Sequence, residues 1–177
     1  MAAIADLPIP LERDGFVRRL IRELAGTLQD VVGVHDAAGY ITVVGAAMGE
    51  HIDSAYRNAL QVERLDRQQV AEVLVDLKKR IEGKFYVKEE AEDRIVFGNS
   101  ACPFGDMVRD RPSLCMMTSN VFGHIAAQNL GYAGVELKET IAEGAPRCTV
   151  VVHLRPKEDQ PLGTMREYFR RDPSAKP

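Results

Sequence analysis

Three cysteines are the residues of this sequence with the most distinctive chemistry. Cys102 lies in a Gly- and Pro-containing loop after a predicted strand, and twelve residues separate it from Cys115, in the first turn of a predicted helix. A helix N-terminus favours a thiolate because its free N–H groups and dipole attract negative charge. Cys148 begins the last predicted strand, on the face that also carries Val150 and Val152. If that face packs against the helix, the three sulfurs lie in one site.

Three thiolates of this kind are typical ligands of zinc or of an iron–sulfur cluster, with a fourth ligand from elsewhere. Asp106, in the same loop, is the candidate for that fourth position. His124 is nine residues from Cys115 and falls on the opposite side of the helix, and His153 has the wrong strand parity. Cysteine is also among the most buried residue types, so packing in a core or a pocket wall is the alternative for all three thiols.

Further polar and apolar side chains gather around the same junction of loop and helix. We expect them to line a ligand pocket, with helix capping and turn formation as the alternative for the polar ones. The predicted pocket residues are Asn99, Phe104, Ser113, Met116, Ser119 and Phe122.

The first half of the chain reads as helical. A helix opens at Asp14 and stops near Gly33, and its apolar side chains recur at helical spacing, which predicts a buried stripe. That stripe comprises Phe16, Val17, Leu20, Ile21, Leu24 and Leu28. The stretch from Asp36 to Met48 is a helix, a broken helix or, over 40–44, a strand, and another helix runs from about Glu50 to Leu60. Asp66 and Gln69 form a capping box for the next helix.

The second half alternates strands with one helix. Residues 85–87 and 95–97 read as a hairpin, Pro112 opens a helix that runs to Leu130, and residues 135–141 and 148–154 read as a second hairpin. The sequence therefore predicts an α+β fold, in which N-terminal helices precede two antiparallel hairpins that flank a helix (β-β-α-β-β). We expect an extended arm over 1–13, one domain over 14–155, and a polar tail over 156–177 with a short helix at 164–171.

Composition excludes several classes of protein. The 177 residues carry a net charge of −3 and a pI of about 5.8, which disfavours direct nucleic-acid binding. No uninterrupted apolar run approaches the ~20 residues of a membrane span, and the first ten residues do not resemble a secretory signal. Three cysteines are an odd number and form no disulfide framework. We therefore expect a cytoplasmic protein without a membrane segment.

Two long motifs resemble the methanogen output domain, a family of signalling proteins often fused to kinase, phosphatase or helix-turn-helix modules. They are the run from Phe97 to Gly105 and the run from Arg111 to Tyr132, and the resemblance extends over about 16–154. The helical start with Gly45 and Gly49 is also similar to 4-vinyl reductase-like domains, which bind small ligands and commonly dimerise. Both likenesses imply a sensory or output domain.

The spacing of the cysteines also resembles the sensor half of the iron–sulfur-sensing repressors of cluster-assembly operons, which hold a cluster with three cysteines. That likeness implies that Cys102, Cys115 and Cys148 are the ligands, although the winged-helix half of those repressors is absent from this sequence. We therefore predict a homodimeric regulatory sensor whose cysteine pocket binds an iron–sulfur cluster, a metal or a small apolar ligand and reports to a signalling partner. The alternatives are an enzyme that uses Cys115 as a nucleophile or redox thiol, and an adaptor with structural cysteines.

Overall fold

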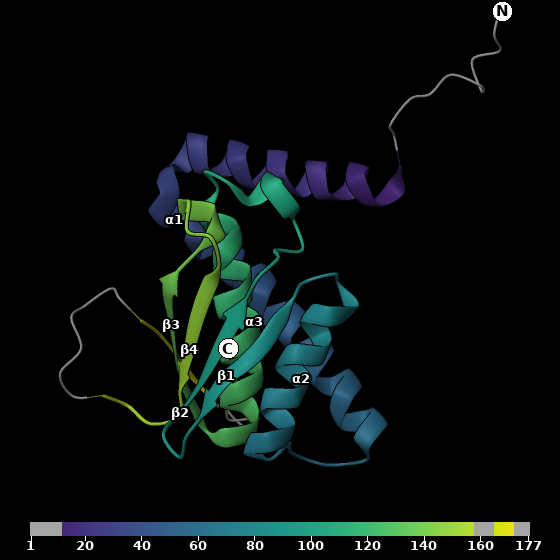
Figure 1. The fold of residues 1–177 in the computed structure, drawn as a ribbon, viewed down its shortest axis with the longest axis vertical. Helices are drawn as coiled ribbons and strands as arrows, with labels where there is room; N and C mark the ends of the chain where they lie inside the picture. Colours follow the sequence, from purple (N-terminus) through teal and green to yellow (C-terminus); the bar gives the residue numbers. More distant parts are fainter. Residues whose placement is uncertain (1–11, 158–164, 172–177) are drawn as a thin grey trace, which may run out of the picture.

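The computed structural model describes residues 12–157 and 165–171 (Figure 1). Three α-helices, two short 3-10 helices and five strands make up this part of the chain. In chain order they are α1 (Arg13–Leu60), α2 (Arg67–Arg80), β1 (Phe85–Glu90), β2 (Arg94–Asn99), η2 (Gly105–Val108), α3 (Pro112–Leu130), β3 (Tyr132–Glu139), η3 (Ile141–Glu143), β4 (Cys148–His153) and β5 (Arg166–Phe169). The predicted extended arm lies almost wholly outside the described residues.

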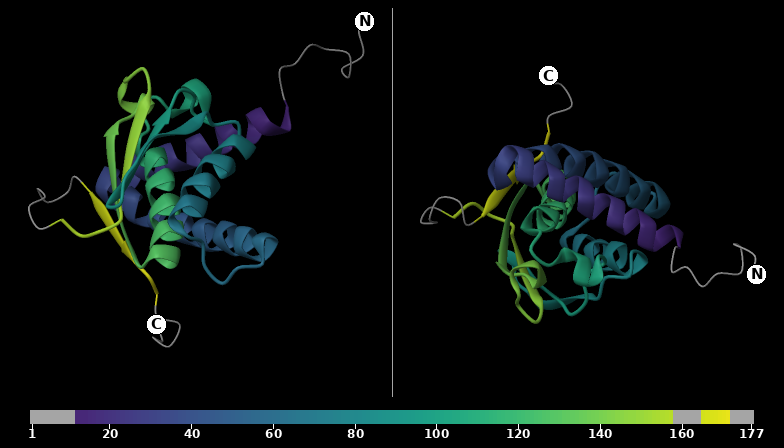
Figure 2. Two further views of the ribbon diagram at one scale, coloured as in Figure 1. Left: turned by 60° about the horizontal axis from the view of Figure 1, so that its bottom comes forward. Right: turned by 90° about the horizontal axis from the view of Figure 1, so that it is seen from above.

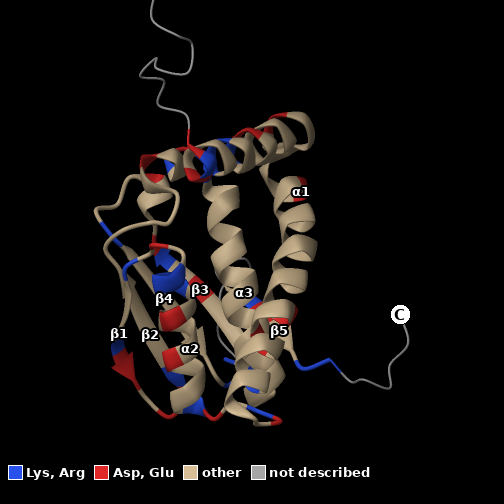
Figure 3. Cartoon of the chain, turned by 90° about the vertical axis from the view of Figure 1, so that its right-hand side faces the viewer, with Lys and Arg blue, Asp and Glu red and all other residues tan. Residues whose placement is uncertain are grey.

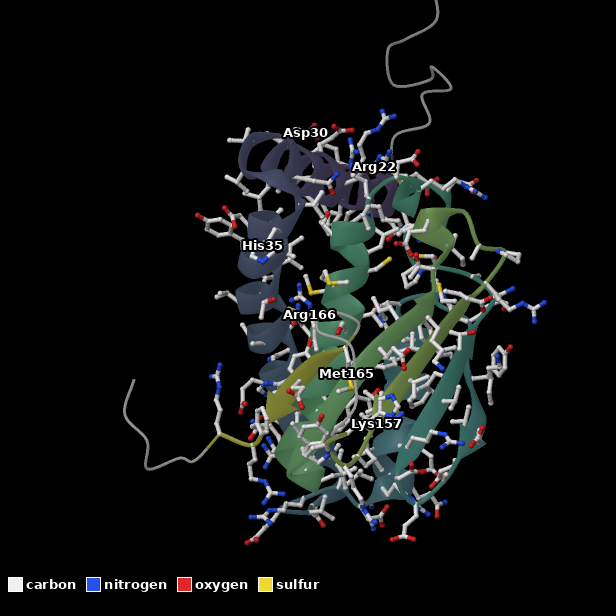
Figure 4. The ribbon with its side chains drawn as sticks, turned by 90° about the vertical axis from the view of Figure 1, so that its left-hand side faces the viewer. Arg22, Asp30, His35, Lys157, Met165 and Arg166 are labelled. Carbon is white, nitrogen blue, oxygen red and sulfur yellow. The ribbon has the colours of Figure 1, made fainter. Side chains whose placement is uncertain are left out.

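The strands form one antiparallel sheet in the order β1-β2-β4-β3-β5, and the helices lie on one side of it (Figures 1 and 2). This arrangement confirms the predicted α+β class and both hairpins. The predicted helix at 164–171 is wrong over Arg166–Phe169, because this segment pairs with β3 and extends the sheet at its edge. Arg166 also donates a hydrogen bond to the Thr42 hydroxyl of α1 at 2.9 Å, so the added strand reaches the helical layer (Figure 4).

The core lies between the sheet and α3. The Phe122 ring of α3 makes edge-on contacts with the rings of Phe85 and Phe97, whose centroids are 5.4 and 5.3 Å away. The side of β2 and β4 that bears Phe97, Val150 and Val152 is fully or almost fully buried there. Helix α2 covers the neighbouring edge, and its predicted capping box is present, with Asp66 accepting from the Gln69 N–H at 2.8 Å. Burial of these large side chains is the main stabilising contribution of the core.

Helix α1 consists of two segments joined at Gly33. The backbone there has φ 82° and ψ 162°, a conformation that glycine adopts without a steric penalty, and the first segment crosses the top of the molecule while the second descends beside α3 (Figure 3). The predicted stop at Gly33 is thus a sharp bend. The strand considered for 40–44 does not form. Gly45 and Gly49 allow the second segment to contact α3 closely, since a Cβ at either position would overlap Asn120 or His124.

The large apolar side chains of the first segment of α1 are exposed. Phe16 and Leu24 are 56% and 63% exposed, and only the small residues Ala25 and Gly26 are buried. The predicted buried stripe is therefore wrong, because five of its six members are exposed and Leu28 is half-buried. Exposed apolar side chains continue along the second segment, at Val43 and Tyr40.

Helix α1 is also long and apolar enough to cross a membrane, by length and composition alone. Its 18-residue window of highest hydropathy has a mean of 1.4, and 22% of that window is buried. Counting uninterrupted apolar runs in the sequence overlooked this stretch, because isolated polar residues interrupt it.

Candidate functional site

All three cysteines line one cavity of about 420 Å³, between the first segment of α1, the end of α2 and the inner side of the sheet. Each comes from a different part of the chain: Cys102 from the loop after β2, Cys115 from the first turn of α3, and Cys148 from the start of β4. The remaining lining is mainly apolar, with side chains such as Phe85, Leu137 and Val150. The predicted gathering of the three cysteines around one site is therefore what the fold produces.

Hydrogen bonds hold the loop that carries Cys102 in place. The Cys102 carbonyl accepts from the Gly105 N–H at 2.9 Å, which starts the turn into η2. The Arg22 guanidinium of α1 donates to the main-chain carbonyls of Met107 and Arg109. The loop is thus tied to the first segment of α1, which forms one wall of the cavity.

Strand register places Cys148 as the alternation predicted. Asn99 and Cys148 are direct partners between β2 and β4, on the same inner side as the Phe97–Val150 pair. The Asn99 amide donates to the Cys148 sulfur at 3.8 Å, and the Ile141 N–H donates to it at 3.4 Å. Cys148 therefore has a fixed position, with its sulfur acting as an acceptor.

Burial keeps two of the thiols protonated. It raises the pKa of Cys115 to about 12, and it also raises the pKa of Cys102. The sequence predicted the opposite direction for Cys115, from its place at a helix N-terminus. The loss of water around the sulfur outweighs the helix dipole here, because a charged thiolate is poorly solvated among apolar side chains.

The sequence analysis missed one central residue of the cavity, Lys78 of α2. This side chain is buried, 6% exposed, and its amine lies 5.3 and 5.4 Å from the ring centroids of Phe85 and Phe122. Its hydrogen bond goes to the Thr118 hydroxyl at 2.8 Å. Burial lowers the pKa of Lys78 to about 8. The signal was present in the sequence: Lys78 is four residues after Leu74 and follows Leu77, so it lies on the buried face of its helix.

The predicted pocket residues lie in several places. Asn99 and Phe104 line the cysteine cavity. Met116 and Ser119 line a smaller pocket on the other side of α3, where the Ser119 and Tyr168 hydroxyls are 3.0 Å apart. Ser113 is buried with no hydrogen-bond partner for its hydroxyl among the described residues, and the Phe122 ring is part of the core.

The expected metal ligands do not form a compact set. Asp106 is exposed and pairs with Arg109 at 3.3 Å, away from the cavity. Within residues 12–157 and 165–171, no group of three or more Cys, His, Asp or Glu side chains is placed to hold one metal ion. His124 pairs with Glu50 at 3.0 Å and His153 with Glu136 at 3.2 Å, whereas His35 is exposed on α1 (Figure 4). Uptake of zinc or an iron–sulfur cluster by the cysteines stays a prediction.

A larger apolar groove of about 960 Å³ adjoins the cysteine cavity. It runs between the two segments of α1 and the face of α2, and its walls include Leu24, Val44 and Met48. The cavity and the groove lie side by side and share seven lining residues: Ile21, Lys78, Arg80, Ile81, Phe104, Leu114 and Met117. Together they have the size and apolar character of a site for a small organic molecule.

Comparison with known proteins identifies the family. The model of methanogen output domain 1 matches residues 20–153. The chain belongs to the methanogen output domain 1 family. This match confirms the resemblance that the two sequence motifs indicated. Comparison with curated protein sequences finds no significant match.

Solved structures place this output domain in a known fold. The phenol-responsive sensory domain of the transcription activator PoxR, solved with phenol, is similar with a TM-score of 0.62 at 15% identity, over 86% of this chain and 83% of that one. A trafficking protein particle complex subunit 3 from Naegleria fowleri, covalently bound to palmitic acid, is similar with a TM-score of 0.56 at 13% identity, over 88% of this chain and 99% of that one. The output domain shares their fold.

Proposed function

We propose that this output domain is a regulatory sensor that binds a small apolar organic molecule in the cysteine cavity and its adjoining groove. The observation that carries this proposal is that an apolar cavity and a larger apolar groove adjoin each other and share lining residues such as Ile21, Leu114 and Met117. Their lining is mainly apolar, with a few polar groups at one end, which is typical of ligand sites. Two proteins of similar fold support the proposal, since one is a phenol-responsive domain solved with phenol and the other is covalently bound to palmitic acid.

Binding of the neutral, apolar dye Nile red tests this proposal. We expect saturable binding with a rise in fluorescence, which Ala55→Trp weakens at least about tenfold because the indole fills the groove. Ala47→Trp is the matched control, since Ala47 is exposed on the same helix but does not line the groove. Unsaturable binding, or equal binding by both variants, would contradict the proposal.

Anaerobic purification distinguishes the binding of a small organic molecule from the binding of a metal or an iron–sulfur cluster. We expect colourless protein with less than about one iron or zinc per ten chains, because two of the thiols are held protonated and thiolates are the species that bind metal. A stoichiometric metal and a visible charge-transfer band, both lost in the triple Cys→Ser variant, would contradict this proposal. The protein would then be a sensor that binds a metal or an iron–sulfur cluster.

We also propose that the sensor is a homodimer that uses the exposed apolar face of α1. This face is defined by Phe16, Leu20, Leu24, Val31, Val34, Tyr40 and Val43. It is continuous with the ligand groove, because Leu24 and the neighbouring Val44 and Met48 belong to the groove wall. A second copy seated there would remove the exposed stripe from water and narrow the mouth of the groove, so that ligand binding and association depend on each other.

Light scattering on the purified protein checks the dimer. We expect a mass of twice 19.6 kDa that Val43→Lys converts to a monomer, because the charge cannot be buried in the interface. Val87→Lys, at a half-exposed position of edge strand β1, is the control and should leave the dimer intact. A monomer that binds phosphatidylcholine vesicles would contradict the dimer and assign this face, on the apolar helix α1, to a lipid surface.

A further inference from the structure

Lys78 is a buried base with no acidic partner among the described residues. Its amine has three N–H donors when protonated, and the described chain gives it one acceptor, the Thr118 hydroxyl at 2.8 Å. Two aromatic rings lie beside it, Phe85 and Phe122, and they attract a cation only weakly compared with a carboxylate. A buried charge without a partner is costly, so proteins rarely retain one that has no use.

The other charged groups of the cavity are already paired. Arg18 lies 2.5 Å from both Asp14 and Glu82, and Arg80 lies 2.6 Å from Asp76. Asp14, Arg18, Arg80 and Glu82 all line the cavity. The protein's own carboxylates near the cavity are therefore engaged, and none of them forms an ion pair with Lys78 within the described residues.

The nearest polar neighbours of Lys78 do not supply a negative charge either. Burial raises the pKa values of Cys102 and Cys115, so both are neutral thiols at physiological pH. The Asn99 side chain is occupied, as its amide donates to Cys148 and its oxygen accepts from the Ala101 N–H. The Thr118 hydroxyl accepts from Lys78 and has its own proton left to donate.

We propose that Lys78 and Thr118 bind the carboxylate of an amphiphilic acid whose apolar chain lies along the apolar walls that the cavity and the groove share. The ammonium group of Lys78 and the hydroxyl of Thr118 are two donor groups, and they suit the two oxygens of a single carboxylate. The surrounding walls are apolar, and Lys78 itself lines both the cavity and the groove. This inference rests on the proposed ligand site and names the chemical class that the site selects.

A matched pair of ligands tests the inference separately from the proposed function. Displacement of Nile red by decanoate is compared with displacement by decan-1-ol, which has the same chain and no charge. We expect decanoate to bind roughly 10- to 100-fold more tightly, because hydrogen bonds to charged groups are the stronger ones. In Lys78→Met this preference should vanish while the affinity for decan-1-ol changes less than about threefold.

Two further variants complete the test. Lys79→Met removes the adjacent, exposed lysine of the same helix and should leave the preference intact. Thr118→Val keeps the lysine and the side-chain shape, and should reduce the preference about threefold to tenfold, so it carries the test if Lys78→Met does not fold. Equal binding of acid and alcohol by the unmodified protein, or an unchanged preference in both Lys78→Met and Thr118→Val, would overturn this inference and leave the proposed function standing. Protein that takes up neither Nile red nor either decyl compound would overturn both.

Discussion

Two buried charges at opposite ends of the helical layer have different surroundings. Asp53 of α1 is fully buried, and it accepts from the Arg57 guanidinium at 2.8 Å and from the Asn129 amide at 2.6 Å. The Asn129 oxygen in turn accepts from the Leu65 N–H at 2.7 Å. Lys78 is almost as buried but has one hydroxyl as its protein partner and an open cavity beside it.

The difference teaches how to distinguish a structural charge from a functional one. At Asp53 each carboxylate oxygen has a donor, so the network closes on itself and joins α1, α3 and the loop before α2. At Lys78 the protein leaves donors unused and supplies room for another molecule. A completed network stabilises the fold, whereas an incomplete one is typical of a site.

The largest expected effect is at the closed network. Asp53→Ala should lower the free energy of unfolding by about 3–5 kcal/mol, because it leaves Arg57 and the buried Asn129 amide without their acceptor. Urea denaturation followed by circular dichroism measures this loss. The exposed Asp36→Ala, on the same helix, is the control. A loss below about 1 kcal/mol would show that the network contributes little to stability.

The next prediction concerns Cys115, whose alkylation rate should depend on pH differently from that of an ordinary thiol. Since burial raises its pKa to about 12, its alkylation by iodoacetamide should keep rising tenfold per pH unit beyond pH 9, where a thiol with a pKa of about 8.5 has levelled off. Pulse labelling with mass spectrometry measures the rate, and urea-unfolded protein is the control. A plateau near pH 9 in the folded protein would restore the thiol-enzyme alternative.

The stability effect at Lys78 should be smaller than that at Asp53 and of opposite sign. Lys78→Met should raise the free energy of unfolding by about 1–3 kcal/mol at pH 7, because an apolar side chain of similar length replaces an unpaired buried charge. Burial lowers the folded-state pKa to about 8, below the unfolded value of about 10.4, so the native protein becomes more stable as pH rises through this interval. The advantage of the variant should therefore shrink from pH 8 to pH 10, as denaturation at several pH values would show. A destabilised variant with no pH dependence would mean that Lys78 is a structural residue.

The smallest effect on the free energy of unfolding is expected at Arg18, which lines the cavity. Arg18→Ala removes the ion pairs with Asp14 and Glu82, and it should cost no more than about 1 kcal/mol because both carboxylates are largely exposed. The loss should disappear in 1 M salt, where such pairs are screened. Arg19→Ala on the neighbouring exposed position is the control. A larger, salt-independent loss would show that the first segment of α1 is held to α2 mainly through Arg18.

Local signals in the sequence predicted most of the fold. The capping box at Asp66, the proline at the start of α3 and the glycine at the α1 bend are each determined by near neighbours, and all three are in place. Parity along β4 likewise placed Cys148 correctly. The apolar stripe of α1 was misassigned because periodicity shows that a face is apolar, not what covers it. The alternation in Arg166–Phe169 is that of a strand, but its charges suggested an exposed helix.

The candidate site was only partly predictable. Its cysteines were found because their residue type is rare and their loop is unusual, whereas the sequence analysis did not consider Lys78. Its helical position pointed inward, yet only the folded chain shows that its neighbours are Phe85, Phe122 and Thr118, which are far apart in the sequence. The thiol pKa values likewise depend on burial, which the helix dipole argument did not include.

The bend at Gly33 separates two tasks that one straight helix would combine. The second segment of α1 contacts α3 closely and lines much of the groove, while the first segment lines the cysteine cavity as well as the other side of the groove. Substitutions at the exposed positions of residues 13–32 can therefore change the lining of the cavity without disturbing the core, in which Ala25 and Gly26 are the buried residues of this segment. Related sensors could diversify their chemical range by changing this one short segment, with the sheet and its central helix kept as a constant support.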